Sequence, residues 1–407
     1  MQSAAQREEI ASRNEESCVA LWQRLSVFNY IHCVCRMLMK PIGEYAVRRS
    51  NLKLANCGYD EWEHMTDTAA VRAGEELNTK ALADYLRDKL EGAGQGIAIE
   101  QFPGGHSNLT YMVRTPVREY VLRRPPLGPV APKAHDMARE YTVLKAVHPY
   151  FAPAPGVYHL CEDPSILGAT FFVMERRHGI VVRDHIPERL VSFENYPERV
   201  SRGFMNCLAD LHAIDIQAHG LTSLGKPEGF LDRQVRGWSE RWTRAKTEEI
   251  VDMDYLLRWL IDHMPASPTP SLVHNDFKLD NVMLDAHDPG RIEAVLDWEM
   301  ATVGDPLVDL GLVLCYWAQP ADPGGTKDTL TTGPGWFTRQ QVVEYYAERT
   351  GRDVSRISYY EVFAVFKLAV VLQQIYVRFH RGQTQDERFR HFDRRVRNLI
   401  EHAVALI

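Results

Sequence analysis

Three polar residues lie at a spacing that suits phosphoryl transfer within residues 272–299, which read LVHNDFKLDNVMLDAHDPGRIEAVLDWE. Asp276 follows an apolar pair, Asn281 comes five residues later, and Asp297 ends a second apolar run. This order predicts strand, loop, strand, turn and strand, with a polar residue at the mouth of each loop. A carboxylate at Asp276 would orient and deprotonate a hydroxyl, and the oxygens of Asn281 and Asp297 are ligands of the kind that Mg²⁺ takes.

Lys278 belongs to the same set, because it lies two residues after Asp276 and would reach the transferred phosphate. The chemistry that needs these residues is phosphoryl transfer from ATP, in which the protein positions the reacting groups and neutralises charge. The alternative is that the stretch is two hairpins whose polar residues only make turns. We favour the catalytic interpretation.

The pattern H-x-D-x-x-x-x-N is formed by His274, Asp276 and Asn281. In this the stretch resembles the catalytic loop of the aminoglycoside phosphotransferase-like kinases, which have the protein-kinase-like fold. Asp297 falls where the D-F-G aspartate of that fold falls, although different residues follow it. The resemblance implies ATP and Mg²⁺ as cofactors, with Asp276 and Lys278 catalytic and with Asn281 and Asp297 as metal ligands.

Two further segments, VLRRPP at 121–126 and LDWEMATVGDPLVDLG at 296–311, resemble one branch of this family. That branch is related to the kinase-like domains of acyl-CoA dehydrogenase fusion proteins, and the resemblance covers about residues 77–407. It implies an α+β, two-lobed fold, with a five-stranded antiparallel sheet in a small lobe and a mostly helical second lobe. The chain is then divided into an N-terminal extension of unknown role, a sheet lobe and a helical lobe, at residues 1–65, 66–175 and 176–407.

A glycine-bearing loop stands between two expected strands, 97–102 and 109–114. Glycines at a hairpin tip let backbone N–H groups approach phosphate oxygens without side-chain interference. Any hairpin favours glycine, so it is the position before the catalytic loop that makes this the expected nucleotide-covering loop. Its predicted cofactor-binding residues are Gly104, Gly105, Ser107 and Asn108.

The third strand, 119–124, carries arginine where protein kinases carry the lysine that holds the α- and β-phosphates. Strand alternation puts Arg123 on one face and Arg124 on the other. The resemblance implies that Arg123 takes the lysine position and pairs with Glu140 of the following helix. Arginine can fill this role because it stays charged and binds phosphate through two N–H groups. The alternative is that both arginines and the glutamate are simply solvated.

The fifth strand ends at Glu175, where the resemblance places the hinge between the lobes. There the Glu175 carbonyl and the Arg177 N–H would bind adenine. In the helical lobe, we expect His212 to be a core residue or to brace the catalytic loop, and Asp309 resembles the structural aspartate that braces this loop. The apolar helix at 359–381 carries charged and amide residues, which indicates a buried core helix rather than a membrane span.

Length and composition fit a globular enzyme of 407 residues, with 45% hydrophobic and 25% charged residues. A net charge of −7 argues against general nucleic-acid binding and gives no membrane-surface signal. Seven scattered cysteines without a signal peptide favour the cytoplasm. Residues 1–65 leave three interpretations open. His32, Cys33 and Cys35 could form a metal site, the segment could be an additional helix that packs on the domain, or it could be translated upstream sequence, with Met65 as the true start.

Three functions fit these features: an ATP-dependent kinase of a small-molecule hydroxyl, a catalytically silent nucleotide-binding or interaction module, and a protein kinase. The intact set of Asp276, Asn281 and Asp297 favours the first. A protein kinase is disfavoured because no A-P-E segment follows Asp297. An aminoglycoside or amino alcohol acceptor would need a cluster of carboxylates around the cleft, for which the sequence offers Glu299, Asp305 and acidic residues of the helices whose positions it does not fix. The aromatic residues of the late helices instead suggest an apolar pocket for a hydroxylated acyl compound: Trp317, Tyr359, Tyr360, Phe363 and Phe366.

Overall fold

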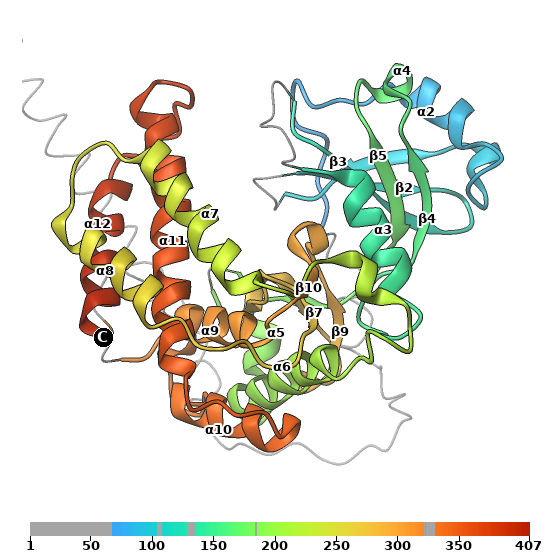
Figure 1. The fold of residues 1–407 in the computed structure, drawn as a ribbon. Helices are drawn as coiled ribbons and strands as arrows, with labels where there is room; N and C mark the ends of the chain where they lie inside the picture. Colours follow the sequence, from blue (N-terminus) through green and yellow to red (C-terminus); the bar gives the residue numbers. More distant parts are fainter. Residues whose placement is uncertain (1–66, 104–107, 128–134, 184, 321, 323–329) are drawn as a thin grey trace, which may run out of the picture. The chain divides into compact units, whose positions relative to one another are not determined.

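The computed structural model describes residues 67–103, 108–127, 135–183, 185–320, 322 and 330–407. The expected extension 1–65, with its Cys/His candidates, lies outside these residues. Within the described chain, an antiparallel sheet with its flanking helices is followed by a mostly helical part (Figure 1).

The predicted five-stranded antiparallel sheet is confirmed, with the strand order β1-β2-β3-β5-β4. The central strand β3 pairs with β2 and β5 over nearly its whole length. The predicted second and third strands match the observed ones residue for residue, and the first begins and ends one residue inside its expected range. The strands are β1 (Ala98–Gln101), β2 (Leu109–Arg114), β3 (Glu119–Arg124), β4 (Val157–Cys161) and β5 (Phe171–Glu175).

The two faces of this sheet belong to different cores. Tyr120 and Leu122 of β3 pack with the helices α2 (Thr79–Leu86) and α4 (Pro164–Leu167) on the outer face. Val121 packs on the opposite face with the helix α3 (Met137–Val147), which joins the core of the helical lobe. Because alternate residues of a strand point to opposite faces, Arg123 must lie on the α3 side with Val121. The predicted strand parity is therefore confirmed.

The catalytic stretch folds as strand, loop, strand, turn and strand, as predicted. Strands β7 and β8 flank the loop that carries Asp276, and β9 precedes Asp297. Two small sheets hold these segments: β6-β8-β9 and the pair β7-β10. The bounds are β6 (Ile180–Val181), β7 (Ser271–Val273), β8 (Val282–Leu284), β9 (Ile292–Val295) and β10 (Thr302–Gly304).

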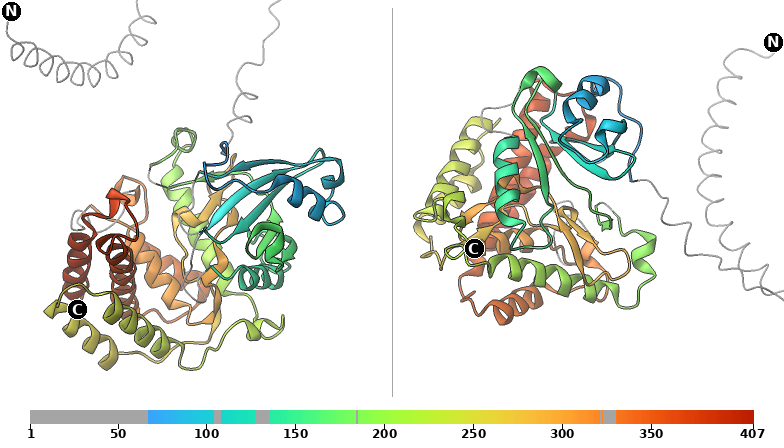
Figure 2. Two further views of the ribbon diagram at one scale, coloured as in Figure 1. Left: turned by 90° about the horizontal axis from the view of Figure 1, so that it is seen from above. Right: turned by 90° about the vertical axis from the view of Figure 1, so that its right-hand side faces the viewer.

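The helices of the second lobe surround these strands, and α7, α8, α11 and α12 lie together at the left of Figure 1. Helix α11 packs against α7, α9 and α12, and helix α8 packs against α12. Figure 2 shows α8, α11 and α12 as neighbours. The longer helices are α6 (Tyr196–His212), α7 (Phe230–Ala245), α8 (Val251–Asp262), α9 (Leu307–Tyr316), α10 (Arg339–Thr350), α11 (Ile357–His380) and α12 (Phe392–Ala405), and α5 (Glu188–Val191) is a single turn.

Helix α11 is long and apolar enough to cross a membrane by length and composition, but 61% of its apolar window is buried within the protein. The predicted buried core helix is thus observed. The aromatic residues from which an apolar acceptor pocket was expected are also part of the core, each no more than 2% exposed: Trp317, Tyr359, Tyr360, Phe363 and Phe366. Trp317 lines a cavity together with Lys278, and the expected pocket stays a prediction. Asp305 is buried as well, where its carboxylate accepts hydrogen bonds from the Tyr360 hydroxyl and the Leu307 N–H.

Helices α9 and α11 approach each other closely at Gly311. A Cβ atom built there would lie 2.4 Å from the Tyr360 carbonyl oxygen, which is backbone and has little room to move. Helix α9 begins just after the Asp297 segment and carries Asp309. The contact at Gly311 therefore fixes the distance between the catalytic segment and the central helix α11.

We predict that Gly311→Ala lowers the free energy of unfolding by about 1–3 kcal/mol, the usual result of overpacking. Gly237→Ala in α7 is the matched control, since the nearest atom to its added Cβ is the flexible end of Arg241 at 3.8 Å. That change should stabilise the protein by about 0.5–1 kcal/mol through helix propensity. Denaturant unfolding of the two variants checks this, and equal effects would contradict the proposed close approach.

Candidate functional site

The loop between β7 and β8 holds Asp276 through Asn281. The Asn281 Nδ2 group donates to the Asp276 carboxylate oxygen Oδ2 at 2.7 Å and to the Asp276 carbonyl at 2.8 Å. The Lys278 Nζ lies 3.5 Å from the same Oδ2. Within the described part of the chain, the other oxygen, Oδ1, has no hydrogen-bond or ion-pair partner. One carboxylate oxygen is therefore fixed and the other is left to act on a ligand.

The backbone of this loop is held by Asp309 of α9. Its two carboxylate oxygens accept from the N–H groups of His274 and Asn275, each at 2.7 Å, and His212 lies 3.2 Å away. Burial raises the pKa of the Asp309 carboxyl, but the hydrogen bonds from His212 and the loop outweigh burial and bring this pKa below its ordinary value. The predicted bracing roles of His212 and Asp309 are both observed.

Lys367 is a buried partner of the loop that the sequence analysis did not place in the site. It lies in α11, is 6% exposed, and donates from Nζ to the Asn275 carbonyl at 2.7 Å. Burial lowers the pKa of this lysine. Asn275 itself has a left-handed backbone, with φ of 63°, a conformation that asparagine tolerates better than most residues. A lone lysine in an apolar helix was the signal that could have identified it.

His274 joins the base loop to the segment that carries Asp297. Its ring is fully buried, and Nε2 donates to the Leu296 carbonyl at 3.0 Å. Burial lowers the pKa of His274. Through its hydrogen bond to Leu296, this buried ring positions the two loops relative to each other.

Asp297 follows β9 and has a left-handed backbone, with φ of 65°. This turn directs its carboxylate toward Arg123 of β3, whose guanidinium lies 2.5 Å from Asp297 Oδ1 and 3.2 Å from Glu140 Oε2. Arg123 is 8% exposed and Glu140 1% exposed. The predicted pair is thus present, and the alternative of solvated side chains is wrong. We name Arg123, Glu140 and Asp297 the charge triad.

Electrostatics within the charge triad keep the guanidinium protonated. Burial lowers the pKa of Arg123, but Glu140 and Asp297 together raise it above its ordinary value. Burial raises the pKa of the Glu140 carboxyl, and the Arg123 charge opposes that rise. Removing one partner of such a buried set leaves an uncompensated charge, which is why these groups depend on each other.

Arg124 is buried on the opposite face of the sheet. It is 6% exposed and donates from one guanidinium nitrogen to the Leu167 carbonyl at 2.9 Å. It thereby ties β3 to the last residue of α4. A buried donor that loses its carbonyl partner costs stability, so this hydrogen bond contributes to the fold.

A cavity of about 410 Å³ lies between the sheet and the β8–β9 strands. Val121, Met174, Met283 and Leu296 give it apolar walls suited to a flat ring system. Of the residues predicted to bind nucleotide or metal, seven line this cavity: Asn108, Arg123, Glu140, Glu175, Arg177, Asn281 and Asp297. The predicted loop residues Gly104, Gly105 and Ser107 lie outside the described residues.

Asn108 sits at one end of the cavity with little exposure. Its Nδ2 donates to Glu299 Oε2 at 3.0 Å, and its buried Oδ1 has no hydrogen-bond partner among the described residues. The side-chain donor that was expected to face phosphate is therefore engaged with Glu299 in this arrangement. A ligand could recruit Asn108 only by exchanging that bond.

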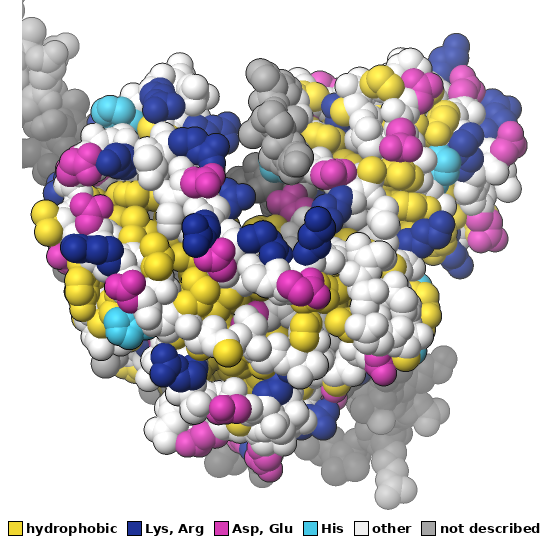
Figure 3. Space-filling model, viewed as in Figure 1, with side chains coloured by type: hydrophobic (Ala, Val, Ile, Leu, Met, Phe, Trp, Pro, Cys, Tyr) yellow, Lys and Arg dark blue, Asp and Glu magenta, His cyan; other side chains and the backbone are white. Residues whose placement is uncertain are grey.

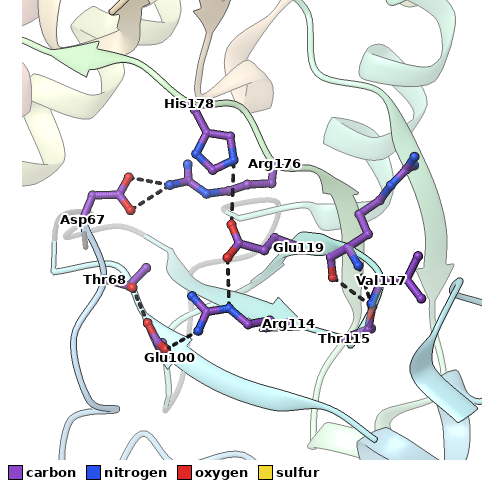
Figure 4. Close-up of polar contacts among 10 residues, drawn as sticks. Asp67, Thr68, Glu100, Arg114, Thr115, Val117, Glu119, Arg176 and His178 are labelled. Atoms are coloured by element: carbon purple, nitrogen blue, oxygen red, sulfur yellow. Dashed lines mark hydrogen bonds and ion pairs between the residues drawn. The ribbon is translucent and has the colours of Figure 1, made fainter. Parts of the chain in front are cut away.

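At the hinge, charged side chains are bonded to each other. Glu175 accepts from the Gly156 N–H at 3.0 Å and pairs with Arg177 at 2.9 Å. Arg176 binds both carboxylate oxygens of Asp67 at 2.7 Å and lies over the Phe102 ring. Figure 4 shows Arg176 and its Asp67 partner beside the ion pairs that link His178, Glu119, Arg114 and Glu100 in turn. These contacts stiffen the segment where backbone groups were predicted to bind adenine.

The oxygens of Asn281 and Asp297 fit a magnesium ion. Both residues line the same cavity, and Asp297 has one carboxylate oxygen that is not paired with Arg123. No cluster of three or more His, Cys, Asp or Glu among the described residues could hold a metal alone. Mg²⁺ commonly takes one or two protein oxygens and completes its shell with phosphate and water, so this pair is suited to a metal–phosphate complex.

Lys278 is held beside the catalytic carboxylate. Its Nζ also lies 3.5 Å from Asp280 and 5.2 Å from the Tyr316 ring centroid. Burial lowers the pKa of this lysine, but Asp276 and its neighbours raise it above the ordinary value, so it remains a cation. The predicted roles of Lys278 and the other site residues in binding ligands stay predictions.

Solved structures with the protein-kinase-like fold resemble this chain. A protein from Ralstonia eutropha, provisionally described as an aminoglycoside phosphotransferase, is 31% identical with a TM-score of 0.70, over 81% of this chain and 98% of the other. An aminoglycoside phosphotransferase in complex with AMP-PNP and hygromycin B is 19% identical with a TM-score of 0.53, covering 80% and 98%. A choline kinase from Cryptosporidium parvum shares the fold at 12% identity and a TM-score of 0.53, with the same coverage.

The chain belongs to the phosphotransferase enzyme family, whose model matches residues 98–342. It is 34% identical over 322 residues to acyl-CoA dehydrogenase family member 10 of Mus musculus, covering 78% of this chain and 30% of that protein. With family member 11 of Rattus norvegicus it is 32% identical over 336 residues, covering 80% and 43%. The chain thus spans less than half the length of these relatives. The predicted family and branch are confirmed, and they support a phosphotransferase that acts on small molecules.

The two adjacent arginines of β3 provide an internal test of the charge triad. Arg123→Ala should weaken binding of a nucleotide by about tenfold or more, a loss of about 1.4 kcal/mol, whereas Arg123→Lys should keep part of the affinity because it keeps a cation. Arg124→Ala should lower the free energy of unfolding by about 1–3 kcal/mol, because the Leu167 carbonyl loses its buried donor, with little effect on affinity. Thermal unfolding first establishes that each variant is folded. Calorimetric titration with AMP-PNP then measures its affinity for nucleotide. A larger affinity loss in Arg124→Ala than in Arg123→Lys would refute the assignment.

Proposed function

We propose that this chain transfers the γ-phosphate of Mg-ATP to a hydroxyl of a small molecule, with a hydroxylated acyl compound as the acceptor. The observation that carries the proposal is that the charge triad and Asn281 line one cavity, while Asn281 donates to the carboxylate of Asp276 in the adjoining loop. ATP would supply the phosphoryl group, and Mg²⁺ would neutralise charge on the phosphates.

Asp276 is proposed to accept the proton of the acceptor hydroxyl. Its Oδ2 is held by Asn281, so the reacting oxygen is Oδ1. The bonds of the loop to Asp309, Lys367 and Leu296 fix the direction in which this oxygen points. A base held in this way loses little orientational freedom when the acceptor arrives.

The cations of the site are proposed to bind phosphate oxygens from two sides. Arg123 approaches from the sheet and Lys278 from the catalytic loop. Asn281 and Asp297 would hold the metal between them. Since Arg123 and the metal would both contact Asp297, binding of Mg-ATP should replace part of the Arg123–Asp297 contact with contacts to phosphate.

The acceptor is proposed from the relatives and from the charges near the cleft. The similarity to acyl-CoA dehydrogenase family members supports an acyl compound. Cationic aminoglycosides and amino alcohols would need carboxylates at the cleft, for which Glu299 and Asp305 were the candidates. Asp305 is buried and hydrogen-bonded, so only Glu299 of these two stands near the cleft, and such acceptors are disfavoured. The deciding experiment measures ADP release with hydroxylated acids, amino alcohols and aminoglycosides side by side. No acceptor-dependent release with any of them would count against the proposal.

Asp276→Asn keeps the shape of the side chain but removes the base. Turnover should fall about 10²-fold or more, because general-base help typically contributes 10²–10⁴-fold, while ATP binding persists. Acceptor-dependent ADP release and a separate nucleotide titration measure the two quantities. Near wild-type turnover in this variant would rule out Asp276 as the base.

Asp297→Ala should weaken binding of Mg-ATP far more than binding of adenosine, because the carboxylate would contact the ion and not the base. Calorimetry with both ligands, with and without Mg²⁺, gives the comparison. An equal loss for both ligands would indicate a general defect or a different metal site.

A further inference from the structure

A second cavity, of about 490 Å³, opens beside the catalytic loop and shares no lining residue with the nucleotide cavity. Asn275 lines it and directly precedes Asp276, so their Cα atoms are about 3.8 Å apart. Glu299 and Met300, which closely follow Asp297, form another part of its wall. The two cavities meet where Asn108 of the first donates to Glu299 of the second. A molecule in this second cavity would therefore lie beside the proposed base.

Helix α7 supplies one wall through residues at helical spacing. Phe230, Arg233, Gln234, Gly237, Trp238 and Arg241 all line the cavity. The remaining arginines of α7 are paired one turn back with carboxylates: Arg236 with Asp232 at 2.8 Å and Arg244 with Glu240 at 3.4 Å. Within the described residues, Arg236 and Arg244 are thus paired inside the helix, whereas Arg233 and Arg241 of the cavity wall have no carboxylate within ion-pair distance.

The cavity is basic, and we name it the basic chamber. Four cations line it, Arg139, Lys226, Arg233 and Arg241, against the single carboxylate of Glu299. Within the described ranges, no carboxylate lies within ion-pair distance of any of these four. Dark blue Lys and Arg side chains gather around the hollow at the centre of Figure 3.

Neutral groups position these cations without cancelling their charge. Arg233 donates to the backbone carbonyls of Lys226 and Glu228, and Arg139 donates to the Ala301 carbonyl at 2.8 Å. Arg241 lies over the Trp238 ring, 4.4 Å from its centroid. Buried Lys367 adds positive charge behind the same ring, at 5.5 Å. Cations fixed in this way are preorganised for an anion.

We propose that the basic chamber binds an anionic group of the acceptor, a carboxylate or a phosphate, while the acceptor hydroxyl reaches Asp276. This inference rests on the proposed function and adds the substrate class that the site selects. Guanidinium groups match the planar oxygens of carboxylates and the oxygens of phosphates through paired hydrogen bonds. A cationic acceptor would meet four like charges in the same space.

The first test measures binding without turnover. With the nucleotide cavity saturated by Mg-AMP-PNP, inorganic phosphate, glutarate and choline are titrated separately into the full chain. We expect phosphate or glutarate to bind and choline not to bind, and the stronger of the two anions identifies the chemistry of the group. Binding of neither anion, or preferential binding of choline, would overturn the inference.

The second test uses a matched pair of double variants on α7. Arg233→Gln with Arg241→Gln should weaken anion binding and raise the KM for a hydroxylated acid by about tenfold or more, with kcat little changed. Arg236→Gln with Arg244→Gln removes the same charge from two arginines of α7 that do not line the cavity. It should change both quantities by less than about twofold, because these arginines are exposed and contact only groups of α7 itself. Equal effects from the two double variants would mean that the loss of positive charge alone, and not the position of the arginines, weakens binding, and would overturn the inference.

The proposed phosphotransferase function and the proposed anion binding in the basic chamber would be refuted by different results. A folded wild-type chain that neither binds Mg-ATP nor releases ADP with any acceptor refutes the proposed function. A chain that releases ADP equally well with a hydroxylated acid and with its uncharged amide refutes the basic chamber alone. Faster release with the acid, lost in the Arg233/Arg241 variant and kept in the Arg236/Arg244 variant, supports both.

Discussion

The buried charge triad is the interaction on which the site depends. Arg123 belongs to β3, Glu140 to α3, and Asp297 to the segment after β9, so one guanidinium connects the sheet, its helix and the proposed metal-binding loop. A buried cation with two carboxylate neighbours is stable only as a complete set, because removal of one member leaves an uncompensated charge in a poorly solvated place. The position of the sheet relative to the catalytic strands is therefore specified by charge as well as by apolar packing.

A second set of contacts fixes the base loop from the opposite side. Asp309 binds two consecutive backbone N–H groups, and Lys367 binds the carbonyl of Asn275. These contacts stabilise the left-handed backbone at Asn275, a conformation that an asparagine adopts only when its surroundings favour it. The strain is thus supported by α9 and α11, whose close approach at Gly311 is part of the same arrangement.

The charges of the cleft divide into two regions with different partners. At the nucleotide cavity and in the adjoining catalytic loop, Arg123 and Lys278 each have a carboxylate neighbour, so a metal–phosphate complex would exchange one set of ionic contacts for another. In the basic chamber, the cations are held by carbonyls and by an aromatic ring. A net charge of −7 for the whole chain gives no indication of this local excess of positive charge, because it averages over all surfaces.

The sequence by itself determined the strand–loop–strand order of the catalytic stretch and the parity that separates Arg123 from Arg124, since these follow from local spacing and strand alternation. The family and the five-stranded sheet followed from the resemblance of its motifs to known kinases. The tertiary structure alone decided which distant residues meet. It placed Lys367 at the catalytic loop and assigned the aromatic residues of the late helices to the core, because burial depends on how helices pack and not on their composition. It also decided that Arg233 and Arg241 face a cavity while Arg236 and Arg244 find carboxylates. Helical spacing does not separate these arginines, because Arg244 follows Arg233 by about three full turns and lies on nearly the same side of α7. Only the packing of α7 against the catalytic segments decides which of them line a cavity.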